Sequence, residues 1–136
     1  MKKITTITSQ EKWSLILNRY NIIWNKIYRL SFYITKYSKL QWLQYRINYR
    51  ILGTNKLLYK IKVSQNNKCT FCSDSIETIE HIFWTCPKVF DVWEELDKWI
   101  YSKVQIELPF NLDIVLFGIL EKTEKKLHKK SHNTIN

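Results

Sequence analysis

The sequence contains little glycine, proline or cysteine, and each shortage excludes a class of protein. Two Gly and two Pro in 136 residues are too few for a loop-rich or all-β fold. Three Cys cannot pair completely, which argues against a disulfide framework. No apolar run reaches the ~18 residues that span a bilayer, and the most apolar segment, 110–120, is interrupted by Asp113. We therefore expect an all-α domain and no membrane segment.

A secretory signal is also not evident, because no apolar core follows the basic N-terminal residues 1–13. We expect the chain to remain in a reducing intracellular compartment, with nucleus and cytoplasm not distinguished. In such a compartment, clustered Cys and His more often indicate a metal site or catalysis than a disulfide.

Acidic residues are almost absent from the first half of the chain. Residues 1–68 hold fourteen Lys and Arg against the single acid Glu11, whereas residues 69–120 carry a net charge of −6. A basic segment rich in aromatic residues suits a polyanion, since phosphates bind Lys and Arg while exposed bases stack on flat rings. The charge therefore predicts RNA or DNA as a partner. The plainer alternative is a solvated basic surface around an aromatic core.

Apolar spacing predicts helices along most of the basic half. Thr8 and Glu11 match a capping box at the start of the first helical region. Apolar residues at steps of three and four predict a helix over 38–52, which Gly53 would end in a left-handed conformation. Thr54 would cap a short helix that follows it.

The second half also reads as helical. A short helix over 77–84 would carry His81, and Pro87 suits the first position of the next helix. Asn111 would cap a last short helix that runs to Leu120. We expect one domain over residues 1–120, made of a basic helical half (1–68) and a metal-site half (69–120). Residues 121–136 would form a basic, fraying tail.

The helix over 38–52 and the turn after it carry the residues expected to bind nucleic acid. Arg46 and Arg50 are four residues apart, which would place them on one helical face beside the similar pair Tyr45 and Tyr49. The competing interpretation puts both tyrosines in the core and leaves the arginines solvated. We expect a single strand or a template–target complex as the ligand. The full predicted set is Trp42, Tyr45, Arg46, Tyr49, Arg50, Lys56, Lys60 and Lys62.

All three cysteines lie within the stretch 69–86, together with one histidine. Cys69 and Cys72 form a CxxC, the spacing of a tight turn that directs two sulfurs at one point. His81 and Cys86 have the separation of the second ligand pair in many zinc modules, which completes C-x2-C-x8-H-x4-C. Three thiolates and one imidazole fill a tetrahedron and leave no position for water. The pattern therefore predicts one structural Zn²⁺ site rather than a catalytic one.

These residues are open to three other interpretations. A CxxC can be a redox pair, but no thioredoxin-like βαβ pattern surrounds this one. A Cys–His pair can act as nucleophile and base, but that chemistry does not require the second cysteine of a CxxC. The thiols can also be inert and buried beside an ordinary core histidine. Four ligands at compatible spacings are more specific than any pair, which favours zinc.

The same stretch resembles the reverse-transcriptase zinc-binding domain, found at the C-terminal end of LINE-type, non-LTR retrotransposon polyproteins. The likeness rests on the run C-x2-C-x8-H-x4-C-P, with Glu77-Thr78 before the histidine, Phe83-Trp84 after it and Trp93 beyond the last cysteine. Weaker likenesses lie at residues 40–47, 52–58 and 116–118. The resemblance implies that Cys69, Cys72, His81 and Cys86 bind zinc. We also expect Trp93 to pack on Phe83 or Trp84.

The family's polymerase activity does not carry over, because Asp91 and Asp97 stand alone and form no paired-aspartate motif. We expect no enzyme, but a zinc-binding, nucleic-acid-binding module derived from such a reverse transcriptase. The alternative is a structural or protein-interaction module that contacts other parts of a retrotransposon polyprotein or a host partner. Its candidate surface is Glu94, Glu95 and Asp97.

Overall fold

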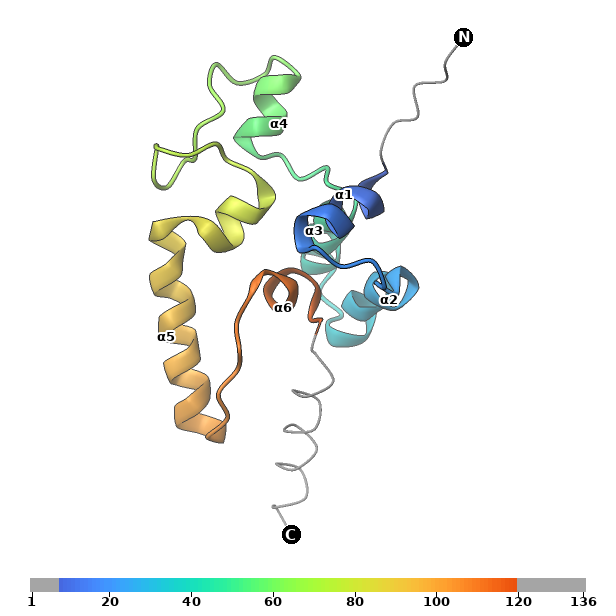
Figure 1. The fold of residues 1–136 in the computed structure, drawn as a ribbon, viewed down its shortest axis with the longest axis vertical. Helices are drawn as coiled ribbons and strands as arrows, with labels where there is room; N and C mark the ends of the chain where they lie inside the picture. Colours follow the sequence, from blue (N-terminus) through green and yellow to red (C-terminus); the bar gives the residue numbers. More distant parts are fainter. Residues whose placement is uncertain (1–7, 120–136) are drawn as a thin grey trace.

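The computed structural model describes residues 8–119, and this part of the chain is helical (Figure 1). The elements are α1 (Ser9–Leu17), α2 (Trp24–Ile34), α3 (Ser38–Asn48), α4 (Asn55–Lys60), the π-helical turn η1 (His81–Thr85), α5 (Pro87–Val104) and α6 (Leu112–Phe117). Within the described range, β pairing is limited to an isolated antiparallel bridge between Lys68 and Ile76. The predicted all-α class is confirmed. Leu120 and the expected tail, 121–136, lie outside the described residues.

Helix α1 begins at the predicted capping box. The Thr8 hydroxyl accepts a hydrogen bond from the Glu11 backbone N–H at 3.2 Å, and the Glu11 carboxylate accepts one from the Thr8 N–H at 2.7 Å. The helix ends at Asn18, which adopts a left-handed conformation. Trp13, the buried residue of α1, is thereby held toward the centre of the molecule.

The apolar core gathers residues from both ends of the described chain. Trp13 is fully buried, and its indole N–H donates to the carbonyl oxygens of Ile47 and Asn48 at 3.1 and 3.2 Å. Phe117 of α6 meets the Trp13 ring edge-on, with centroids 5.0 Å apart. Figure 1 shows α6 returning to lie beside α1–α3. The buried apolar set is Trp13, Ile27, Ile47, Ile79, Leu116 and Phe117.

Helix α3 ends earlier than predicted. Its last residue is Asn48, and Arg50 rather than Gly53 takes the left-handed conformation, with φ 55°. The Arg50 guanidinium lies over the Trp13 ring, 4.3 Å from its centroid, and pairs with Glu80 at 3.3 Å. These tertiary contacts outweigh the local signal of the glycine. Because Arg50 lies beyond the helix, it does not share a helical face with Arg46, as the spacing had suggested.

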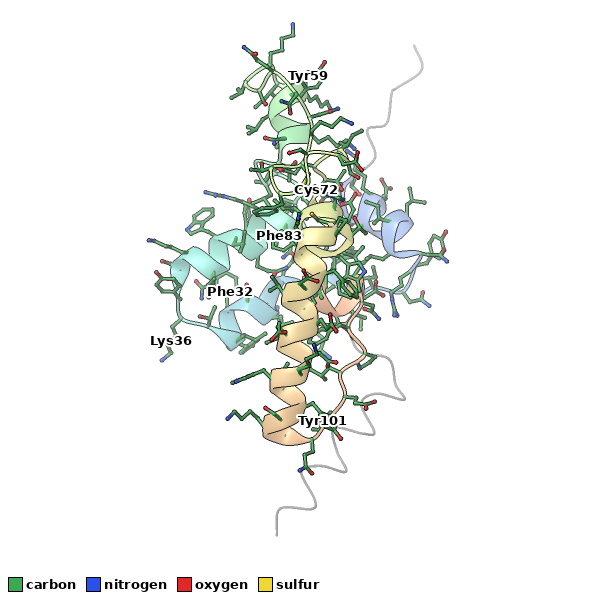
Figure 2. All side chains as sticks on the ribbon, turned by 90° about the vertical axis from the view of Figure 1, so that its left-hand side faces the viewer. Phe32, Lys36, Tyr59, Cys72, Phe83 and Tyr101 are labelled. Atoms are coloured by element: carbon green, nitrogen blue, oxygen red, sulfur yellow. The ribbon has the colours of Figure 1, made fainter. Side chains whose placement is uncertain are left out.

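Helix α5 stands along one side of the molecule and is covered only in part. It begins at Pro87, as predicted, and none of its residues is buried. Figure 2 shows Cys72 and Phe83 near its start and Tyr101 near its far end. Residues 105–111 then return to α6 (Figure 1). No helix in the described part of the chain is both long enough and apolar enough to cross a membrane.

Candidate metal centre

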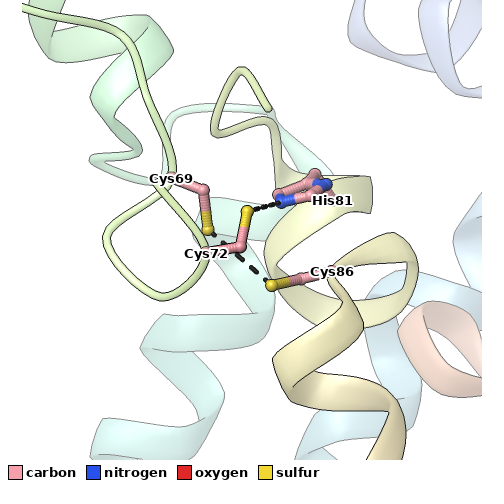
Figure 3. A group of neighbouring side chains, drawn as sticks. All are labelled: Cys69, Cys72, His81 and Cys86. Carbon is pink, nitrogen blue, oxygen red and sulfur yellow. Dashed lines mark hydrogen bonds between the residues drawn. The ribbon is translucent and has the colours of Figure 1, made fainter. Parts of the chain in front are cut away.

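The four candidate ligands converge at one point, although they come from two separate parts of the chain. Cys69 and Cys72 lie in the loop after the Lys68 bridge, and His81 and Cys86 lie at the two ends of η1 (Figure 3). Their three Sγ atoms and a histidine ring nitrogen all lie within 4.8 Å of one another. Cys69, Cys86 and His81 are buried, while Cys72 is half-buried. The expected CCHC cluster is therefore present.

The separations between ligand atoms suit a tetrahedral zinc ion. Bonds of ~2.3 Å to sulfur and ~2.0–2.1 Å to nitrogen imply edges of about 3.8 Å between sulfurs and about 3.6 Å between sulfur and nitrogen. The Cys69 and Cys86 sulfurs are 3.9 Å apart, and the Cys72 sulfur is 3.4 Å from His81 Nε2. A disulfide needs ~2.05 Å between its sulfurs, and all three cysteines are free thiols. The donor set and its spacing fit Zn²⁺.

Backbone N–H groups of the CxxC loop point at its sulfur atoms. The turn closes through a hydrogen bond from the Ser73 N–H to the Cys69 carbonyl at 2.9 Å. The Phe71 N–H points at the Cys69 sulfur, 3.4 Å away. N–H groups of Ser75 and Asp74 donate to the Cys72 sulfur and, with His81, lower the pKa of Cys72 to about 6. Cys72 is therefore largely thiolate at neutral pH, the form that binds metal.

Cys69 differs from Cys72 because it is buried. Burial raises the pKa of the Cys69 thiol, and the N–H groups of Cys72 and Phe71 offset only part of this effect. A bound cation would supply the remaining stabilisation of its thiolate, since a coordinating thiol is deprotonated.

The π-helical turn η1 sets the position of His81 relative to Cys86. The sequence predicted a short helix over 77–84. In the structure helical backbone begins at Ile79, continues as the π-helical turn His81–Thr85, and is closed by a hydrogen bond from the Cys86 N–H to the His81 carbonyl at 2.9 Å. Nδ1 of His81 lies 3.1 Å from the Thr85 hydroxyl. With Nε2 bound to a metal, Nδ1 carries the proton and donates to Thr85, which fixes the ring. Thr85 had no signal in the sequence beyond its position beside Cys86.

Glu77 is a buried carboxylate that connects the CxxC loop to α4. It accepts hydrogen bonds from the Thr70 N–H and hydroxyl at 2.7 and 2.8 Å, and from the Asn55 N–H at 2.8 Å. Burial acts to raise the pKa of Glu77, but these donors outweigh it and hold that pKa below its usual value. The sequence showed Glu77 only as part of a family motif, and its structural role became visible only once the loop and α4 were placed together.

Trp93 anchors the start of α5 beside the cluster. Its indole N–H donates to the Phe83 carbonyl oxygen at 2.7 Å. The Trp93 ring lies 6.4 Å from the Trp84 ring and 5.7 Å from the Phe110 ring, measured between centroids. The predicted packing of Trp93 against the residues after His81 is confirmed. Its ring is half-buried rather than enclosed.

A family model described as zinc-binding in reverse transcriptase matches residues 7–93, well over half of the chain. The chain belongs to this family. The match covers all four residues of the CCHC cluster and ends at Trp93, so α6 and most of α5 lie beyond it. It confirms the resemblance seen in the sequence. No solved structure matches the chain.

The residues predicted to bind nucleic acid in this zinc-binding family member fall into two groups. Trp42, Tyr45 and Arg46 are exposed on α3, and Tyr49 is exposed at its end. Lys56, Lys60 and Lys62 are exposed on α4 and just after it. Figure 2 places Tyr59 of α4 well apart from Lys36, which precedes α3. Arg50 belongs to neither group, because it is largely covered and paired with Glu80.

Proposed function

We propose that the chain is a structural zinc module in which Cys69, Cys72, His81 and Cys86 hold one Zn²⁺. The observation that carries this proposal is the convergence of four donor atoms at separations that fit a zinc tetrahedron. Four protein ligands leave no open coordination position for water, so the metal orders the fold and performs no chemistry. The module itself has neither polymerase nor endonuclease activity.

The partner of the module is RNA or DNA, bound by its basic half. Between Lys12 and Ser73 the sequence has no Asp or Glu, so the surfaces of α2, α3 and α4 carry cations without acids of their own. Such a surface attracts phosphates and releases their counterions. The protein would act inside the cell, in a reducing compartment where the thiolates remain free to bind zinc.

The test is the salt dependence of nucleic-acid binding by the zinc-loaded protein. Affinity should fall steeply with salt, and the double variant Arg46→Glu with Lys60→Glu should reduce the slope by about 1.4, since each single-strand phosphate contact contributes about 0.7. Lys88→Glu with Lys103→Glu, two exposed positions of α5, is the matched control. If the wild type binds neither RNA nor DNA at low salt, the proposed partner is wrong.

A second candidate function is protein interaction through α5. Its outer surface combines exposed apolar side chains with the acids Glu94 and Glu95. The partner would be another part of a retrotransposon polyprotein or a host protein, and such an apolar contact would depend little on salt. The exposed apolar set is Phe90, Val92, Trp99, Tyr101 and Val104.

A further inference from the structure

A row of aromatic rings runs along the outer face of α3 and onto α2. Trp42 meets Tyr45 edge-on with centroids 5.5 Å apart, and Tyr45 lies 4.6 Å from Tyr49. Tyr49 stacks on Tyr28 of α2 at 5.4 Å, with planes only 8° apart. We call Trp42, Tyr45, Tyr49 and Tyr28 the ring row. The three rings on and just after α3 are not core residues, because Trp42, Tyr45 and Tyr49 are 59%, 45% and 42% exposed.

An open hollow of about 440 Å³ adjoins the exposed end of the ring row. The described residues that line it are Lys39, Trp42 and Arg46. A rise of about 1.5 Å per residue places Lys39 and Arg46 about 10 Å apart along the helix, with Trp42 between them. Within the described residues, no carboxylate forms an ion pair with either cation. The volume is in the range of small-ligand pockets, roughly 300–1,000 Å³.

We infer that this hollow is a subsite for one nucleotide of a single-stranded RNA or DNA. The base stacks on Trp42, its neighbouring phosphates contact Lys39 and Arg46, and the next base reaches Tyr45 and Tyr49. The inference rests on the proposed function and adds to it the strandedness of the ligand and a role for Lys39. The ring of Tyr28 supports Tyr49 from the α2 side.

The exposed rings favour a single strand over a duplex for a geometric reason. Bases in a duplex are already stacked on one another, whereas those of a single strand present free faces that stack on aromatic side chains. Helices α2 and α3 also hold no Asp or Glu that would repel phosphates, since the sequence has none from Lys12 to Ser73. An acidic peptide would contact Lys39 and Arg46, but its backbone supplies no flat group for Trp42, whereas every nucleotide carries a base that can stack.

The experiment compares two tryptophans of equal exposure in the zinc-loaded full chain. Trp42 and Trp99 are both 59% exposed, and Trp99 lies on α5 outside the ring row. The variants are Trp42→Ala, Trp42→Phe and Trp99→Ala. For each we measure the affinity for three labelled ligands: an unstructured 20-nucleotide RNA, the matching DNA strand and the DNA duplex. Metal content and helicity are checked for each variant, so that a folding defect is recognised.

Trp42→Ala should weaken single-strand binding about 5- to 150-fold with an unchanged salt slope, since stacking involves no counterion. Trp42→Phe should retain most of the affinity, and Trp99→Ala all of it. Lys39→Gln should lower the slope by about 0.7, the contribution of one phosphate. Duplex binding, where present, should not respond to Trp42→Ala.

Three results would overturn the inference while leaving the proposed function intact. Trp42→Ala and Trp99→Ala could behave alike, which would show binding by charge alone. The duplex could bind as tightly as the single strand, and Trp42→Ala could reduce both affinities by the same factor. Heparin, a polyanion without bases, could compete as well as RNA of the same charge. Absence of all nucleic-acid binding by the wild type would instead refute the proposed function, and the inference with it.

Discussion

The molecule has two structural centres, the apolar core around Trp13 and the CCHC cluster, and they are built in different ways. The apolar core around Trp13 draws on α1, α2, α3 and α6, which span most of the described chain. The CCHC cluster uses only residues 69–86. Apart from two of the thiols, the buried apolar side chain of this segment is Ile79, which packs into the core around Trp13. A segment so short cannot bury enough apolar surface to hold its own shape, and a metal supplies what packing does not.

The two centres are joined by Ile79, which is buried in the apolar core with Phe83 packed against it, and by polar contacts. Arg50 stacks on Trp13 in the core and pairs with Glu80, next to the ligand His81. Glu77 connects the CxxC loop to Asn55 at the start of α4. Because most residues of the apolar core lie outside the segment 69–86, perturbing the metal site should leave much of that core in place.

Removal of zinc should have the largest effect and should act locally. Structural zinc contributes ~10–16 kcal/mol of apparent binding free energy in small zinc-finger peptides. Cys86→Ser, or a strong chelator, should abolish stoichiometric metal and remove amide-exchange protection from residues 67–93. Protection in α1 and α3 should persist. Equal stability with and without chelator, read by thermal unfolding, would count against a structural metal.

The reciprocal change is Trp13→Ala, which opens the apolar core. Loss of a buried tryptophan typically costs ~3–5 kcal/mol of unfolding free energy, and here the hydrogen bonds to Ile47 and Asn48 are lost as well. Denaturant unfolding measures the loss, while metal analysis should still find one zinc per chain. If Trp13→Ala also releases the metal, the two centres are one cooperative unit and the comparison fails.

Glu77→Gln should weaken the connection between the centres. The variant keeps the size of the side chain but removes the charge that accepts three short hydrogen bonds from Thr70 and Asn55. Hydrogen bonds to charged groups contribute ~1.5–3 kcal/mol each, so a loss of about 2 kcal/mol is expected at neutral pH. Zinc should bind more weakly, because Thr70 lies inside the CxxC.

The pH dependence of that difference follows from the lowered pKa of Glu77. A carboxylate with a lowered folded-state pKa stabilises the fold above its unfolded value of about 4.3, and this contribution is lost as pH falls through the folded-state pKa. The stability gap between wild type and Glu77→Gln should thus be constant above about pH 5 and shrink below pH ~4. A gap that grows on acidification would contradict this assignment.

The smallest predicted effect concerns the anchor of α5. Trp93→Phe keeps an aromatic ring beside Trp84 and Phe110 but removes the N–H that donates to the Phe83 carbonyl. A neutral hydrogen bond contributes ~0.5–1.5 kcal/mol, so a loss of about 1 kcal/mol is expected in denaturant unfolding, with metal content unchanged. A loss as large as that of Trp13→Ala would show that α5 belongs to the core.

Part of this structure was predictable because its signals are local. The capping box at Thr8 and the first-turn position of Pro87 were predicted correctly from neighbouring residues alone. The four-residue CCHC cluster was predicted because ligand spacing limits how a chain can surround one ion. The end of α3 was not, since Arg50 overrides Gly53 through contacts with residues far away in sequence.

The sequence by itself determined the helical class, the basic character of the first half and the convergence of three cysteines with His81. These depend on composition, periodicity and short spacings, which act through the backbone over a few residues. Only the tertiary structure decided that Arg50 is bound to Trp13 and Glu80 and that Glu77 joins the zinc loop to α4. It also decided that Tyr28 extends the rings of α3. Each of these depends on which distant side chain fills the neighbouring space, and periodicity carries no information about that.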